Sequence, residues 1–221
     1  MKPASAALCL GLLLVGQVGE GKGPPREKGS FRKPDLVELV LMDPTIRLDI
    51  RYATAANLVR RPVYAQARAF LQRPAAEALV RAHRSLAGEG YGMLVFDGYR
   101  PWSVTKLFWQ LTTREQRAFV ADPKEGSKHN RGCAVDLTLY ELATGREVEM
   151  PSAYDETTER ASPAYAGGTA EARAQRDLLR RAMEREGFRV EPNEWWHFNY
   201  KDWREYPLLD IPFEKLALPP P

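Results

Sequence analysis

Two short segments of the chain carry most of the side chains that could bind a metal ion. Residues 127–136 read S-K-H-N-R-G-C-A-V-D and residues 194–197 read E-W-W-H, and together they hold two of the three histidines. Imidazole nitrogens and carboxylate oxygens are suitable zinc ligands, and a catalytic zinc usually keeps three protein ligands and one position for water. His129, Asp136 and His197 therefore form a candidate site for one zinc ion per chain.

Glu194 could supply the base that hydrolysis at such a site requires. It lies three residues before His197, so the two side chains share a side only on a helical turn or a bent strand. His197 would bind the metal and Glu194 would act as general base, a division of labour similar to that of H-E-x-x-H. A histidine followed by an aspartate seven residues later is more often a surface pair, so it is the combination of both segments that favours a metal site.

Cys133 lies inside the first segment, and its thiolate could also bind zinc. We interpret it instead as a small buried side chain, because His129 and Asp136 already satisfy the ligand pattern. Once an N-terminal leader containing Cys9 is removed, Cys133 is the one cysteine left, so no internal disulfide is expected.

The elements around these residues follow from hydrophobic patterning. Residues 134–139 predict a buried strand that would hold Asp136 rigidly, and Gly132 lets the backbone bend before it. A second buried strand is predicted at residues 91–96, which would bring Arg100 to a strand end. There its guanidinium could face a cleft or form a structural salt bridge.

Further predicted elements are helices at residues 75–87, 103–111 and 170–186 and short strands at residues 35–41, 46–52, 188–190 and 195–200. The third histidine, His83, stands between Arg81 and Arg84, which indicates a solvated helix face and not a ligand position.

Composition limits the remaining possibilities. A chain of 221 residues with 44% hydrophobic residues predicts one compact domain. The net charge of +3, from 32 basic and 29 acidic residues, is too small to indicate nucleic-acid binding.

The N-terminus has the features of an export signal. Lys2 precedes an apolar run at about residues 6–18, which is too short for a membrane span. We predict a signal peptide at residues 1–21, a Gly- and Pro-rich linker at 22–34 and the functional domain at 35–221, with an uncleaved anchor as the alternative.

The motif S-x-H-x-x-G-x-A-x-D, followed some sixty residues later by E-x-W-H, resembles the zinc D-alanyl-D-alanine dipeptidases, the VanX-like metallopeptidases. The resemblance extends to D-I-R-Y-A-T-A-A-N at residues 49–57, F-D-G-Y-R-P at 96–101 and D-L-T-L-Y at 136–140. It covers roughly residues 35–213.

The resemblance implies further site residues. Arg100 would stabilise the oxyanion of the tetrahedral intermediate, a task that its permanent charge and paired donors suit. Asp155 would receive the free amino group of the substrate, and Tyr52, Tyr64 and Ser127 would also contact substrate. The loop before Asp155 reads M-P-S-A-Y-D where the family pattern has M-G-T-x-F-D, so its conformation is less well specified.

The resemblance also implies an α+β fold, a single domain with a central, mostly antiparallel sheet flanked by helices and the metal at the open edge of the sheet. The expected activity is zinc-dependent hydrolysis of D-Ala-D-Ala in the bacterial periplasm or cell exterior. The expected partner is a small dipeptide, with no membrane association after signal removal and an open oligomeric state.

Two other functions are compatible with the same motifs. One is a D,D-carboxypeptidase that trims peptidoglycan stem peptides, which needs an open cleft in place of a closed ammonium pocket. The other is a non-catalytic, zinc-bearing cell-wall-binding domain, which the presence of both Glu194 and Arg100 disfavours.

Overall fold

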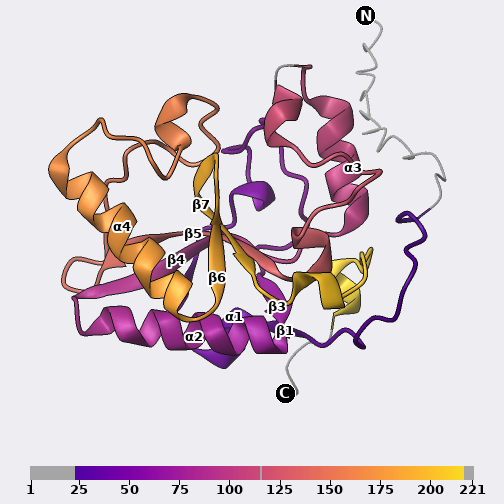
Figure 1. Cartoon of the computed structure of the whole chain (residues 1–221), viewed down its shortest axis with the longest axis horizontal. Helices are drawn as coiled ribbons and strands as arrows, with labels where there is room; N and C mark the ends of the chain where they lie inside the picture. The colour runs from indigo at the N-terminus through magenta and orange to yellow at the C-terminus, as the bar shows by residue number, and fades with distance from the viewer. Residues whose placement is uncertain (1–22, 115, 217–221) are drawn as a thin grey trace, which may run out of the picture.

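Five strands form the central sheet in the computed structural model of the chain, which describes residues 23–114 and 116–216 (Figure 1). Their order is β2-β4-β5-β7-β6; β2 runs parallel to β4 and every other pair is antiparallel. These strands are β2 (Arg47–Leu48), β4 (Tyr91–Asp97), β5 (Ala134–Glu141), β6 (Phe188–Glu191) and β7 (Glu194–Tyr200). The predicted α+β fold with a mostly antiparallel sheet is confirmed. The predicted signal peptide lies outside the described residues.

Helices cover the sheet. They are α1 (Leu39–Met42), α2 (Arg73–Ala87), α3 (Trp102–Leu111) and α4 (Ala170–Arg185). Helices α2 and α4 contact each other and lie along the sheet (Figure 1). The start of α2 carries Pro74 in its first turn, where a missing N–H costs no hydrogen bond. The side chain of Thr169 caps α4 by accepting from Ala172 N.

Register within the sheet brings polar residues into one row. Asp136 of β5 is paired with Asp97 of β4 on one side and with His197 of β7 on the other. Directly opposed residues on neighbouring strands point to the same face, so the three side chains gather on one face of the sheet. A bulge at Phe96 in β4 shifts the register by one residue and so aligns Asp97 with Asp136.

The position of this row corrects one expectation. We expected the metal site at the open edge of the sheet, but β5 and β7 are interior strands. Strand β5 is buried along nearly its whole length because both of its faces are covered. The sequence pattern around Asp136 could indicate a buried strand, but it carried no information on the strand's neighbours.

The N-terminal part of the domain is less regular than predicted. The strand expected at residues 35–41 is β1 (Leu36–Glu38) followed directly by α1, and β1 pairs with β3 (Phe70–Gln72) in a separate two-stranded sheet. The strand expected at 46–52 is reduced to the two residues of β2, after which the chain forms a 3₁₀ turn, Arg51–Ala53.

His83 is buried, which makes the solvated face predicted for it wrong. Its Nδ1 accepts a hydrogen bond from Met93 N at 3.1 Å, and its Nε2 lies 2.8 Å from Thr45 Oγ1. Burial lowers the pKa of this imidazole. His83 therefore ties α2 to β4 as a neutral core residue, away from the other two histidines.

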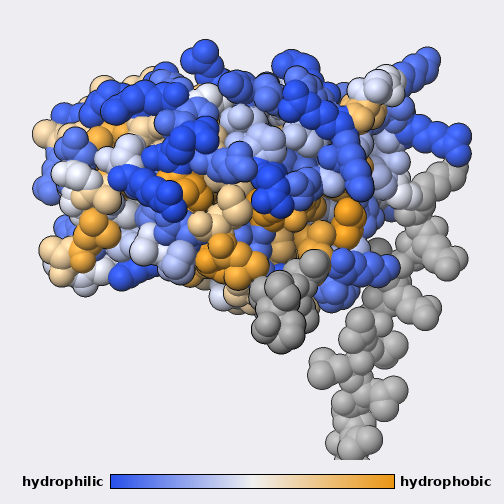
Figure 2. Space-filling model, turned by 90° about the horizontal axis from the view of Figure 1, so that it is seen from below, coloured by the Kyte–Doolittle hydropathy of each residue, from blue (hydrophilic) through white to orange (hydrophobic). Residues whose placement is uncertain are grey.

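The segment before β1 lies against the domain without forming a helix or strand. The Glu27 carboxylate pairs with Arg131 and accepts from Leu208 N at 2.7 Å, while Arg32 pairs with Glu205. Seen from below, the surface is largely hydrophilic, with a group of apolar residues near its middle (Figure 2). No helix in the described part of the chain is long and apolar enough to cross a membrane.

The backbone turn between His129 and Asp136 depends on Gly132. It has φ +68° and ψ +26° immediately after the 3₁₀ helix His129–Arg131, and a Cβ there would lie 2.5 Å from Leu36 Cδ2. We expect Gly132→Ala to destabilise the protein by at least about 1 kcal/mol, since left-handed backbone costs a non-glycine residue about that much before any steric clash. Urea unfolding measures the difference; an unchanged midpoint would contradict this account of the turn.

Candidate active site

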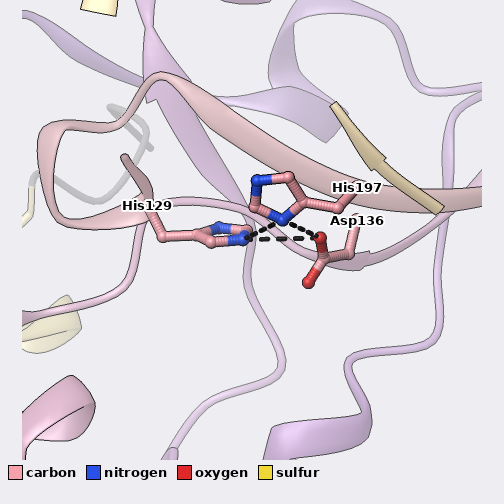
Figure 3. A group of neighbouring side chains, drawn as sticks. All are labelled: His129, Asp136 and His197. Carbon is pink, nitrogen blue, oxygen red and sulfur yellow. Dashed lines mark hydrogen bonds and ion pairs between the residues drawn. The ribbon is translucent and has the colours of Figure 1, made fainter. Parts of the chain in front are cut away.

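His129 at the start of a 3₁₀ helix, Asp136 on β5 and His197 on β7 converge on one point (Figure 3). His129 Nε2 lies 3.2 Å from His197 Nδ1 and 3.4 Å from Asp136 Oδ1, and His197 Nδ1 lies 2.9 Å from the same oxygen. Tetrahedral zinc with bonds of about 2.0–2.2 Å holds its ligand atoms roughly 3.3–3.6 Å apart. The donor set therefore suits a zinc ion, and all three separations lie within about 0.4 Å of the spacing that the ion requires.

Contacts on the outer side of each ligand decide which atom faces inward. His129 Nδ1 lies 2.7 Å from Gly98 O, which can only accept, so Nδ1 carries the hydrogen and Nε2 presents a lone pair. The Tyr154 hydroxyl donates to Asp136 Oδ2 at 3.0 Å, which leaves Oδ1 free to face the histidines. Asp136 Oδ1 is buried and accepts no hydrogen bond from any described residue.

These contacts leave lone pairs pointing at one another, so the site needs a cation. A second proton on His197 would meet this need. Burial disfavours the charged imidazole, but the Asp136 carboxylate 2.9 Å away outweighs burial and raises the pKa of His197 to about 9. A divalent metal competes with that proton, so metal binding releases it.

Glu194 stands at the first position of β7, beside the convergence point. Its Oε2 lies 3.7 Å from His197 Nδ1, and the side chain lines a cavity of about 420 Å³ that also reaches all three metal-ligand candidates. Burial, aided by the charge of Asp136 and opposed by that of His197, raises the pKa of Glu194 to about 7. A carboxylate with such a pKa can take and return a proton near neutral pH.

Arg100 lines the same cavity and is held by a carboxylate that the sequence did not single out. Its Nε and Nη2 donate to Asp97 Oδ2 at 3.0 and 2.7 Å, and its Nη2 lies 3.9 Å from Asp136 Oδ2. Both Arg100 and Asp97 are buried. Arg100 thus both lines the cavity and forms a salt bridge, although the sequence analysis treated these two interpretations as alternatives.

Tyr64 lies behind Arg100 and is not among the residues that line the cavity within the described chain. Its hydroxyl donates to Asp97 Oδ1 at 2.8 Å, the oxygen that also accepts from Gly98 N at 2.9 Å. Its contacts thus support a role in holding Asp97 and not the substrate contact that the resemblance implied.

Asp155 and Tyr52 meet at another wall of the cavity. The Tyr52 hydroxyl donates to the Asp155 carboxylate at 3.1 Å, and Leu58 N donates to it at 3.2 Å. Burial, followed by the charge of Asp136, raises the pKa of Asp155 to about 7. Asp155 has φ +61°, a conformation that aspartate tolerates better than most residues. A cation placed here would relieve the burial of this carboxylate.

Ser127 and Cys133, the two remaining candidate site residues of the first segment, differ in their position relative to the cavity. Ser127 lines the cavity, and its Oγ accepts from His129 N at 3.2 Å, so the serine supports the turn that carries the histidine. Cys133 is buried, as predicted, and its Sγ donates to Arg131 O at 3.6 Å. The metal cluster does not include Cys133.

Sequence reasoning missed residues that support the site without lining its centre. Asp97 falls within the F-D-G-Y-R-P motif and precedes Arg100 by three positions, a signal that could have identified it as the counter-ion. Tyr154 occupies the one aromatic position of the M-P-S-A-Y-D loop, but nothing in the sequence indicated that its hydroxyl reaches Asp136.

An antiparallel sheet that presents a two-histidine, one-carboxylate centre beside a half-buried glutamate and a buried arginine defines a metallopeptidase type of site. The family model described as D-ala-D-ala dipeptidase matches residues 32–214, so the chain belongs to that family of metallopeptidases.

Two named relatives in sequence agree with this assignment. The chain is 32% identical to the D-alanyl-D-alanine dipeptidase of Escherichia coli over 84% of its own length and 94% of that protein. It is 34% identical to the enzyme of the same name from Enterococcus faecium, over 76% of its length and 92% of the relative. A vancomycin-resistance D,D-pentapeptidase VanY solved with Zn(II) overlaps 63% of this chain and 77% of its own, at 18% identity and a TM-score of 0.40.

Zinc should stabilise the folded protein through these three ligands. At about 100 times its dissociation constant, a ligand specific to the native state adds about 2.7 kcal/mol to the free energy of unfolding. We expect a higher thermal midpoint with zinc for the wild type and for Glu171→Gln, an exposed control on α4, but not for Asp136→Ala. An equal rise in Asp136→Ala would place zinc elsewhere.

Proposed function

We propose that the protein is a zinc-dependent dipeptidase that hydrolyses D-Ala-D-Ala to free D-alanine. The observation that carries this proposal is one cavity that holds the His129–Asp136–His197 cluster together with a half-buried base, a buried guanidinium and a half-buried carboxylate. Family membership and the names of the two relatives support the same substrate. The preference for D-residues follows from the family and not from any single contact.

The three metal-ligand candidates, Glu194 and Arg100 each have a place in the proposed reaction. Zinc held by His129, Asp136 and His197 would supply Lewis acidity that makes a water acidic near neutral pH. Glu194 accepts a proton from the attacking water and delivers it to the leaving amine. Arg100, kept in place by Asp97, donates to the oxygen that becomes negative.

The Asp155 pocket favours a free dipeptide over a longer substrate. Its carboxylate is half-buried and already receives the Tyr52 hydroxyl and Leu58 N, so an ammonium ion is the group that best completes its charge balance. A stem peptide would place an uncharged amide there. We therefore propose dipeptidase action and retain D,D-carboxypeptidase action as the outcome that the following assay can distinguish.

Hydrolysis of three substrates tests the proposal directly. We expect the purified protein to cleave D-Ala-D-Ala, to lose activity with a chelator and to regain it with zinc, and to leave L-Ala-L-Ala and a stem pentapeptide intact. Release of alanine from the pentapeptide alone would favour the carboxypeptidase. Zinc binding without hydrolysis of any substrate would favour the non-catalytic cell-wall-binding domain.

We also propose that the enzyme is exported and acts in the bacterial periplasm or outside the cell. The support is the apolar run in the predicted signal peptide. An exported dipeptidase suits recycling of D-Ala-D-Ala or wall remodelling better than depletion of a cytoplasmic dipeptide pool.

Glu194→Gln should separate catalysis from metal binding. The amide keeps the size of the side chain but cannot accept a proton, so we expect kcat to fall by about 10²–10⁴. Zinc content should stay at one ion per chain, as measured by metal analysis of the same sample. Hydrolysis at the wild-type rate would refute the assignment of the base.

Arg100→Lys should lower kcat while leaving zinc bound. Lysine retains the positive charge but lacks the paired donors that Asp97 orients, and loss of one oxyanion donor commonly costs about 10²–10³ in kcat. Steady-state kinetics on D-Ala-D-Ala measures the effect. A change confined to KM would instead assign Arg100 to substrate binding.

A further inference from the structure

A chain of hydrogen bonds runs from a cavity lysine to the back of one metal-ligand candidate. Lys128 Nζ donates to Glu191 Oε2 at 2.9 Å, and Asn199 Nδ2 donates to the same oxygen at 2.8 Å. Asn199 Oδ1 in turn lies 2.9 Å from His197 Nε2. Lys128, Glu191 and Asn199 have no part in the reaction described above.

The chemistry of these groups fixes the direction of every link. A carboxylate only accepts, so the amide group that faces Glu191 must be the NH₂ of Asn199. The carbonyl oxygen of Asn199 then faces His197, and because it too only accepts, the hydrogen must sit on His197 Nε2. His197 Nδ1 is thereby left with the lone pair that points at His129 and Asp136.

The same contacts join the two parts of the metal site. Lys128 immediately precedes the 3₁₀ helix that begins with His129, and Glu191 is the last residue of β6. Strands β6 and β7 form a hairpin that carries both Glu194 and His197. The Lys128–Glu191 pair therefore links segments 63 residues apart at the point where their ligands must meet.

We propose that Glu191, held by Lys128, is a positioning residue for the metal ligand His197. Through Asn199 it selects the tautomer with Nδ1 free, and through Lys128 it fixes the hairpin relative to His129. This inference deepens the proposed function and rests on its zinc site. It concerns metal affinity, which is measured without substrate, so its failure is separable from failure of the dipeptidase assignment.

The partial exposure of the Lys128–Glu191 pair distinguishes a positioning role from a simple contribution to folding stability. The side chains of Lys128 and Glu191 are 33% and 32% exposed, and ion pairs of that exposure add little to folding stability. Groups that orient a metal-binding histidine from behind commonly change metal affinity or activity by about 10–100-fold. The expected signature is weaker zinc binding with a nearly unchanged unfolding midpoint in the absence of zinc.

The experiment compares zinc dissociation constants, measured in the full chain by competition with a chelating indicator. We expect Glu191→Ala to bind zinc about 10–100-fold more weakly and Lys128→Met to shift in the same direction. Lys128→Arg, which keeps a cationic donor, should restore the wild-type value. The matched control is Glu186→Ala, which removes the Arg81–Glu186 pair on the surface and should leave zinc affinity unchanged.

Two further readouts keep the test specific. Nitrogen-15 NMR of the zinc-bound protein should place the hydrogen of His197 on Nε2 in the wild type, and that hydrogen should exchange faster with solvent in Glu191→Ala. At zinc concentrations that saturate the variant, kcat should recover while KM stays unchanged.

Three results would overturn the inference. Unchanged zinc affinity in Glu191→Ala would do so, as would an equal loss in Glu186→Ala. A raised KM with unchanged zinc affinity would also do so, since it would make Glu191 a substrate contact.

Discussion

Three acceptor atoms whose lone pairs face one another are the constraint on which the site depends. His129 Nε2, His197 Nδ1 and Asp136 Oδ1 lie within 3.4 Å of each other. Such an arrangement is repulsive unless a cation occupies it, and it persists because each ligand is held from behind. A backbone carbonyl, a tyrosine hydroxyl and an asparagine amide provide those outer contacts.

The same constraint explains the charge balance of the cavity. Asp136, Asp155 and Glu194 are among the carboxylates that line it, and Asp97, which is not part of the lining, pairs directly with Arg100. Burial raises the pKa values of Asp155 and Glu194 to about 7, with the charge of Asp136 acting in the same direction. A divalent metal and a substrate ammonium would both lower these pKa values. This charge balance supports the proposal of two cations, one at the metal-ligand candidates and one at Asp155.

Sequence reasoning anticipated which side chains lie together where their chemistry is unusual and failed where it is common. Two of the three histidines, in motifs with a fixed spacing, pointed to the candidate metal-ligand cluster and its neighbouring glutamate, which the fold brings together. His83 was misjudged because its arginine neighbours on α2 concealed a side chain that packs against β4. Asn199 and Tyr154 gave no signal, since amides and hydroxyls occur everywhere and only strand pairing shows what they reach.

Strand pairing also explains why the site lies in the interior of the sheet and not at its edge. Moving β7 by one residue against β5 would turn its side chains to the opposite face and separate His197 from Asp136. An edge strand is held on one side only, whereas β5 is held by β4 and β7, and β7 by β5 and β6. Interior strands therefore fix the register from both sides, and ligand spacing accurate to a few tenths of an ångström requires that restraint.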